Sequence, residues 1–178
     1  MTMELPRRIR TVAYADPPYI GQAKKHYSAD PNCAEVDHEA LINVLEFCYP
    51  DGWALSCRSP SLQQILAYCP PNVRVMAWVK PFCSFKPGVN PAYAWEPIIV
   101  GGAGRKRSRK EPTVRDWVSA NITLKKGLAG AKPPQFCEWL FDALGLQPDD
   151  TFVDIYPGTG AVTAAWKAWK ELRASCAA

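Results

Sequence analysis

Short apolar runs alternate with helix-length amphipathic segments along this chain. The apolar runs have the length of buried strands and lie at residues 11–15, 53–57, 73–79, 95–100 and 151–156. Apolar residues recur at helical spacing in the segments that we expect to be helices, at residues 37–48, 59–68, 136–144 and 161–173. Strands separated by helices are typical of a parallel α/β sheet. The pattern predicts one domain over residues 1–178.

Local signals mark the ends of these helices. Asp37 is suited to cap the first helix, and the turn at residues 50–52 ends it. Ser59, which precedes Pro60, is expected to be the N-cap of the second helix. Gly145 is expected at the C-terminus of the third.

Residues 101–131 show no periodicity, and their glycines and Pro112 predict a loop or insert. Charge is concentrated there, because residues 105–132 carry a net charge of +7 and the rest of the chain −3. A basic segment on a nearly neutral body predicts a polyanionic partner. The alternative is a solvated loop without a partner. The side chains expected to contact nucleic-acid phosphates are Arg105, Lys106, Arg107, Arg109 and Lys110.

Composition excludes several classes of protein. The seven cysteines include no Cys-x-x-Cys pair and are accompanied by only two histidines, so no metal site is expected. No apolar run has the length of a bilayer span, and no apolar segment follows the N-terminal arginines as in a secretory signal. An odd number of cysteines without an export signal predicts reduced thiols and a cytoplasmic protein.

The first stretch with a chemical signature is Asp16-Pro17-Pro18-Tyr19, directly after the first strand. Methyl transfer to the exocyclic amine of a base needs an acceptor for each N–H, because the nitrogen lone pair is otherwise delocalised into the ring. The Asp16 carboxylate can accept one N–H, and a carbonyl of the proline turn can accept the other. Tyr19 offers a face on which an unstacked base can lie. The alternative is a rigid turn in which Asp16 caps nearby amides.

The second stretch is a strand that runs into Gly158-Thr159-Gly160 and then a helix. Such a turn lets a ligand approach the backbone, and the N-terminus of the helix favours a carboxylate. Alone, this pattern has many chance occurrences.

Together the two stretches resemble the DNA amino-methyltransferases, which use S-adenosyl-L-methionine (SAM). Asp16-Pro17-Pro18-Tyr19 matches the catalytic motif of that family, and residues 154–160 are similar to its SAM-binding loop Asp-x-Phe-x-Gly-x-Gly, with Tyr156 in place of Phe. The order, with the catalytic motif first, resembles the permuted β class. Lys132-Pro133 resembles the family block that helps to close the SAM pocket. Residues 78–80 and 95–100 are similar to further family blocks.

The resemblance implies a Rossmann-like SAM-dependent methyltransferase fold, with a mostly parallel sheet, helices on both faces and a reduced number of strands. It implies SAM as the cofactor and methyl transfer to adenine N6 in DNA, since Asp at the first motif position resembles the adenine enzymes. Cytosine N4 and RNA adenine are alternatives, and a non-catalytic nucleic-acid-binding protein of this fold is the alternative from another class. The residues implied to bind SAM are Lys132, Asp154, Tyr156, Pro157, Gly158, Thr159 and Gly160.

The pattern departs from the family after the second stretch. Family members continue into a strand with an acidic residue for the SAM ribose, whereas here about eighteen residues follow Gly160. We expect Glu171 to be a surface charge of the last helix instead. A homodimer is one way to cover the exposed sheet edge. The small recognition region predicts low sequence specificity or a short target.

Overall fold

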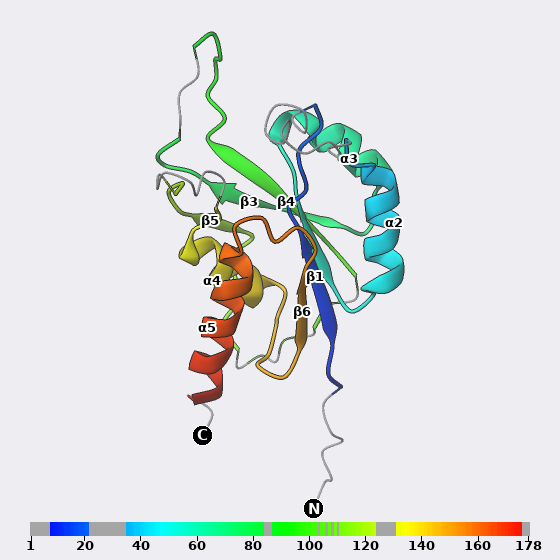
Figure 1. Ribbon diagram of the computed structural model, residues 1–178, viewed down its shortest axis with the longest axis vertical. Helices are drawn as coiled ribbons and strands as arrows, with labels where there is room; N and C mark the ends of the chain where they lie inside the picture. Colours follow the sequence, from blue (N-terminus) through cyan, green and yellow to red (C-terminus); the bar gives the residue numbers. More distant parts are fainter. Residues whose placement is uncertain are drawn as a thin grey trace, which may run out of the picture.

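The computed structural model describes residues 8–21, 35–83, 87–102, 104, 105, 107, 109, 111–123 and 131–175. Its centre is a six-stranded sheet with the order β5-β3-β4-β2-β1-β6 (Figure 1). The strands are β1 (Thr11–Ala15), β2 (Trp53–Ser56), β3 (Arg74–Val79), β4 (Trp95–Gly101), β5 (Trp117–Ser119) and β6 (Thr151–Asp154). Five of them lie where the apolar runs predict strands, and β5 lies in the segment expected to be a loop.

The sheet is mixed, which corrects the prediction of a mostly parallel one. β1 is parallel to both β2 and β6, and β3 is parallel to β5, but β4 is antiparallel to its two neighbours, β2 and β3. The cause is the connection from β3 to β4. Its described residues, 80–83 and 87–94, contain no helix, and a parallel return usually needs a helical crossover.

Helices cover both faces of the sheet, as predicted (Figure 1). The helices α2 (His38–Cys48) and α3 (Leu62–Tyr68), with the 3-10 turn η1 (Ser59–Ser61), lie on one face, and α4 (Pro134–Ala143) and α5 (Ala161–Ser175) lie on the other. Alternate β1 side chains point to opposite faces. Ala13 and Ala15 pack into the core under α2, whereas Val12 and Tyr14 pack into the core under α4 and α5.

The ends of the helices follow the local signals with one exception. Asp37 Oδ1 accepts a hydrogen bond from the amide of Ala40 at 2.9 Å, which confirms the predicted N-cap. Gly145 follows α4 with φ of +63°, in the left-handed region. The exception is Ser59, whose side chain caps no helix. Its carbonyl instead accepts from the amide of Leu62, which closes a 3-10 turn before α3 begins.

A buried ion pair joins the amino ends of β1 and β6. The guanidinium of Arg10 lies 2.9 Å from Asp150 Oδ2, and the amide of Arg10 donates to Asp150 Oδ1 at 3.0 Å. The guanidinium also donates to the carbonyl of Gly145 at 2.7 Å. This cluster connects the amino ends of the two strands whose other ends carry the sequence motifs.

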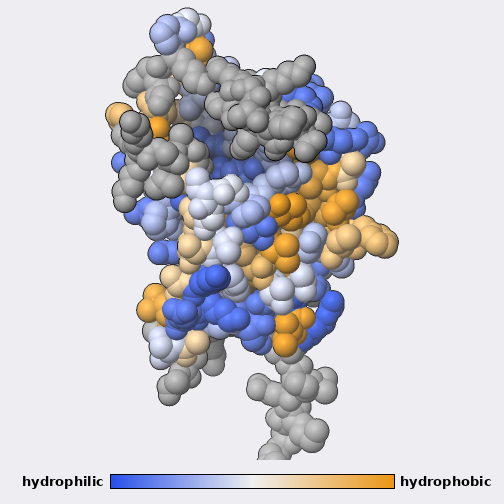
Figure 2. All heavy atoms as spheres, in the orientation of Figure 1, coloured by the Kyte–Doolittle hydropathy of each residue, from blue (hydrophilic) through white to orange (hydrophobic). Residues whose placement is uncertain are grey.

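The surface of the helices is mixed in character. On the face shown in Figure 2, apolar surface gathers over the side formed by α2. Two apolar residues of this helix, Val44 and Phe47, are 48% and 88% exposed. Glu171 is an exposed residue of α5, as expected. Within the described residues, no helix combines the length and the apolar character needed to cross a membrane.

Candidate active site

The two sequence motifs lie next to each other at the carboxyl edge of the parallel strands. Tyr14 of β1 stands opposite Asp154 of β6, and the amide of Ile155 donates to the carbonyl of Tyr14 at 2.9 Å. Asp16 follows β1 directly, and the segment that we call the 154–160 loop leads from the end of β6 to α5. Open α/β sheets bind ligands at this edge. The pairing of β1 with β6 therefore assembles one site from two distant parts of the chain.

Two side chains hold the carboxylate of Asp16. The ammonium of Lys132 lies 3.0 Å from each of its oxygens, and the hydroxyl of Tyr19 donates to Oδ1 at 3.2 Å. Pro17 is buried and anchors the turn. The Asp16 side chain remains 23% exposed. Because a carboxylate offers about four lone-pair positions, Asp16 keeps acceptor capacity for a ligand.

Lys132 is the centre of a row of alternating charges. Its ammonium lies 3.2 Å from Glu96 Oε1, and the other oxygen of Glu96 pairs with Lys80. The side chains of Lys132 and Glu96 are only 5% and 7% exposed. The ammonium groups of Lys80 and Lys132 lie 4.3 and 5.3 Å from the ring centre of Trp78. Asp16, Lys132, Glu96 and Lys80 thus form a row that we call the charge row.

Burial and neighbouring charges shift the pKa values of three groups of the charge row, in different directions. Burial alone would lower the pKa of Lys132, but Asp16 and Glu96 outweigh it and hold this pKa well above its usual value. Burial raises the pKa of Glu96, against the charge of Lys132. Burial and the neighbouring Lys132 lower the pKa of Lys80 to about 8. Lys132 is therefore a permanent cation beside Asp16.

The charge row includes Lys80 and Glu96, for which the sequence pattern predicted no role. Both stand in blocks that resemble the family, which was the available signal. They meet because β3 and β4 pair antiparallel, with Trp78 opposite Glu96. Lys132, predicted from the resemblance to help close the SAM pocket, has its ammonium on Asp16 and Glu96. Its part in cofactor binding stays a prediction.

The 154–160 loop combines open space at one glycine with a carboxylate oxygen that has no partner in the described part of the chain. Gly158 and Gly160 have φ of +47° and +75°, and no heavy atom lies within 4 Å of a Cβ placed at Gly160. Asp154 Oδ2 accepts from the hydroxyl of Thr163 at 2.8 Å, whereas Oδ1 is buried and has no hydrogen-bond partner among the described residues. Burial raises the pKa of Asp154, and the charge of Asp16 adds to this effect.

The remaining residues of this loop are more accessible. Tyr156 is half-buried, and Pro157 and Thr159 are exposed. The helix α5 begins directly after Gly160, so its N-terminal amides face the loop. An unpartnered acceptor, open space at a glycine and a helix N-terminus together suit a ligand that carries both hydrogen-bond donors and a carboxylate.

The basic segment leaves the sheet at the opposite edge. Gly101, the last residue of β4, stands opposite Trp53, the first residue of β2. Because β4 is antiparallel, its end lies at the amino edge of the parallel strands, and Asp16 lies at their carboxyl edge. The position of the basic segment therefore depends on the direction of β4, which the sequence pattern did not predict.

Two of the predicted phosphate contacts are engaged with the protein itself. Arg105 donates to the carbonyl of Gly145 at 3.1 Å and pairs with Glu111 at 2.7 Å. Arg107 donates to the carbonyls of Pro112 and Asp142. Arg109 is exposed, and Lys106 and Lys110 lie outside the described residues. Nucleic-acid binding by this segment stays a prediction.

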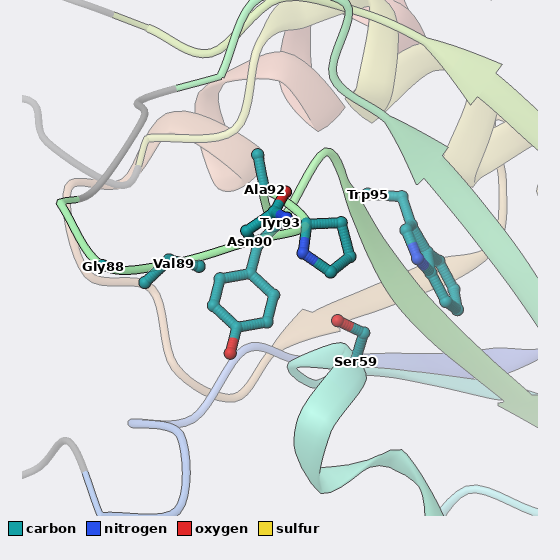
Figure 3. A pocket seen from close by; sticks show the side chains of 8 residues that line it. Ser59, Gly88, Val89, Asn90, Ala92, Tyr93 and Trp95 are labelled. Carbon is teal, nitrogen blue, oxygen red and sulfur yellow. The ribbon is translucent and has the colours of Figure 1, made fainter.

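Two adjoining cavities lie near the charge row, and one of them reaches the turn at Asp16 to Tyr19. The smaller, of about 220 Å³, is lined by Tyr19, Lys80 and Glu96 among others. The larger, of about 350 Å³, shares Tyr93 and Trp95 with the smaller one (Figure 3). The shared lining shows that the two hollows adjoin, and the smaller brings a ligand next to Tyr19 and the charge row.

Comparisons with known proteins identify the fold. No protein-family model and no curated protein matches the sequence. Among solved structures, the M1.HpyAVI–SAM complex matches with a TM-score of 0.58 and 15% identity, over 91% of this chain and 80% of that chain. A crystal structure of M1.HpyAVI matches with a TM-score of 0.59 and 13% identity, over 91% and 77%. The chain therefore has the methyltransferase-like fold that M1.HpyAVI also has.

Proposed function

We propose that this chain transfers a methyl group from SAM to the exocyclic amine of a nucleobase, namely N6 of adenine in DNA. The observation that carries the proposal is the placement of Asp16 beside the 154–160 loop at the ends of β1 and β6. Acceptor groups for an amine and an open ligand loop thereby share one edge of the sheet. The shared fold with M1.HpyAVI, which was solved in complex with SAM, supports the proposal.

The residues of the 154–160 loop fit SAM. The unpartnered oxygen of Asp154 can accept a hydrogen bond from a donor of the cofactor, and the open space at Gly160 leaves room for it. The N-terminus of α5 favours its carboxylate. SAM, when bound, supplies an electrophilic methyl group on a sulfonium centre. The residues proposed to hold it are Asp154, Tyr156, Pro157, Gly158, Thr159 and Gly160.

The turn at Asp16 to Tyr19, which we call the catalytic turn, positions the amine. Asp16 accepts a hydrogen bond from one N–H, and a carbonyl of the Pro17-Pro18 turn accepts the other, which leaves the nitrogen lone pair free to attack. Tyr19 stacks on the base. As the new N–C bond forms and the C–S bond of the donor breaks, the amine becomes acidic, and its proton passes to Asp16 or to water. Lys132 holds both oxygens of Asp16 in place during this change.

The direct test is a mass analysis of nucleosides from DNA and RNA incubated with the chain and SAM. We expect N6-methyladenine in the DNA, and we expect Asp16→Asn to remove it while the fold and the SAM affinity measured by calorimetry persist. Asp116→Asn serves as control, because the Asp116 side chain is 52% exposed and pairs with Arg74 far from the charge row.

The outcomes separate the alternatives. N4-methylcytosine in DNA, or methyladenine in RNA alone, would replace the proposed base or nucleic acid while keeping the chemistry. A folded wild type that binds no SAM but binds DNA in a salt-sensitive way would contradict methyl transfer. That result would favour the non-catalytic nucleic-acid-binding protein.

A further inference from the structure

Exposed aromatic rings border the cavity beside Tyr19. Tyr93 and Trp95 are 43% and 39% exposed. Both line the two adjoining cavities, and Ser59 faces them from the start of η1 (Figure 3). Aromatic rings left open to solvent beside a hollow are suited to stack on the bases of a single nucleic-acid strand.

The charge around these rings is favourable for a phosphate. The guanidinium of Arg58 lies over the ring of Tyr93, 5.2 Å from its centre, and both Arg58 and Lys80 line the smaller cavity. The only carboxylate among the described residues of either lining is Glu96, which is already engaged by Lys132 and Lys80. Because Lys80 is paired with Glu96, Arg58 is the cation that we assign to the phosphate. An aromatic face with this cation beside it matches the base and the phosphate of one nucleotide.

The two cavities together extend from Tyr19 of the catalytic turn past Tyr93. The smaller cavity contains Tyr19, whose hydroxyl donates to Asp16 at 3.2 Å. Tyr93 lines this cavity too, and it also lines the larger one, whose described lining does not include Tyr19. A strand whose target base lies at Tyr19 would therefore bring a neighbouring nucleotide to Tyr93.

We propose that Arg58 and Tyr93 form a binding site for an unpaired DNA nucleotide that flanks the target base. The inference rests on the proposed function, because the flanking nucleotide belongs to the substrate strand. It assigns contact with the DNA strand to the start of η1 and to the described residues 87–94 before β4. Arg105 and Arg107 of the basic segment bind protein carbonyls at the other edge of the sheet and are less suited to this contact.

The chain contains a matched control for the test. Arg115 lies over the ring of Trp117, 5.4 Å from its centre, and Trp117 is 43% exposed, as is Tyr93. Trp117 lies on the edge strand β5 and lines neither cavity. Tyr93→Ala and Trp117→Ala thus remove similar cation-stacked aromatic rings at two different places.

The experiment measures the affinity of the full chain for a fluorescently labelled single-stranded DNA oligonucleotide, with an RNA of the same sequence as a second probe. We expect Tyr93→Ala to weaken DNA binding about tenfold, and Trp117→Ala to change it less than about twofold. Arg58→Gln should weaken DNA binding and lower the slope of log affinity against log salt by about one. SAM affinity should be unchanged in all three variants.

Several results would overturn the inference. These are an unchanged DNA affinity in Tyr93→Ala, an equal loss in Trp117→Ala, binding of the RNA probe alone, and no oligonucleotide binding by the wild type. Failure of this inference can be distinguished from failure of the proposed function. Loss of DNA affinity in Tyr93→Ala with no methyl transfer by the wild type keeps the nucleotide site and rejects the enzyme. Methyl transfer that Tyr93→Ala leaves at wild-type efficiency keeps the enzyme and rejects the site.

Discussion

The ammonium nitrogen of Lys132 lies 3.0 Å from each carboxylate oxygen of Asp16, although the two residues are 116 positions apart in the chain. Lys132 comes just before α4, and Asp16 comes just after β1. The contact therefore connects the segment before α4 directly to the turn at Asp16 to Tyr19. The same ammonium also contacts Glu96, so two carboxylates share one buried cation.

Replacement of Lys132 should affect both stability and the site. Lys132→Met leaves the partly buried Asp16 without its cation and the buried Glu96 with Lys80 alone, so we expect the free energy of unfolding to fall by about 3–5 kcal/mol. Denaturant unfolding measures this loss. Lys167→Met, at an exposed position of α5, should change it by less than about 0.5 kcal/mol. Wild-type stability in Lys132→Met would contradict this role of the shared cation. Calorimetry with SAM on the folded variant tests the predicted cofactor role.

Gly160 should matter for the cofactor more than for the fold. Gly160 and Gly104 have φ of +75° and +63°, and neither has a heavy atom within 4 Å of an added Cβ. Alanine at either position should therefore cost about 1 kcal/mol of stability through backbone strain alone. Only Gly160→Ala should also weaken SAM binding, by about tenfold in calorimetry, because its Cβ enters the space proposed for the cofactor. Equal SAM affinities in the two variants would argue against that location.

Arg105 should contribute to stability rather than to strand binding. Its guanidinium donates a hydrogen bond to the Gly145 carbonyl and pairs with Glu111. Arg105→Ala should therefore lower the free energy of unfolding by about 1–3 kcal/mol. Arg109→Ala, at an exposed position, should be nearly neutral for stability. Thermal or denaturant unfolding compares the two. An unchanged stability together with reduced DNA affinity in Arg105→Ala would contradict this and would support the phosphate contact that the sequence predicts for Arg105.

Acid should weaken the ion pair between Arg10 and Asp150. Burial alone would raise the pKa of Asp150, but the amide and guanidinium of Arg10 outweigh it and hold this pKa below its usual value. Because the folded-state pKa is lower than the unfolded one, the stabilisation is complete at neutral pH and is lost as the pH falls through the folded-state pKa.

Asp150→Asn is therefore expected to lower the free energy of unfolding by about 3 kcal/mol at pH 7, and the difference from wild type should shrink below about pH 4. Urea unfolding at pH 7, 4 and 3 provides the comparison. Asp116→Asn, at an exposed position, should lower the free energy of unfolding by less than about 1 kcal/mol at pH 7. A difference for Asp150→Asn that stays constant down to pH 3 would show that the ion pair is not its source.

The positions of most helices and strands follow from the sequence by itself. Asp37 caps α2 as predicted, because an N-cap depends on a side chain and an amide only three residues apart. The three-residue strand β5 left no such signal, since it is too short for an apolar period and forms by pairing with β3. The N-cap prediction for Ser59 is wrong, because its carbonyl, not its side chain, closes the 3-10 turn before α3.

The sequence also determined the two stretches that carry the proposed chemistry, Asp16 to Tyr19 and the 154–160 loop, because each is a local pattern after a strand. Only the tertiary structure decided what surrounds them. The reversed direction of β4 placed Glu96 and Lys80 beside Lys132 and carried Arg105 to the far edge of the sheet. Strand direction and pairing between distant segments depend on how the chain returns through space, and a single sequence has no local period that records this.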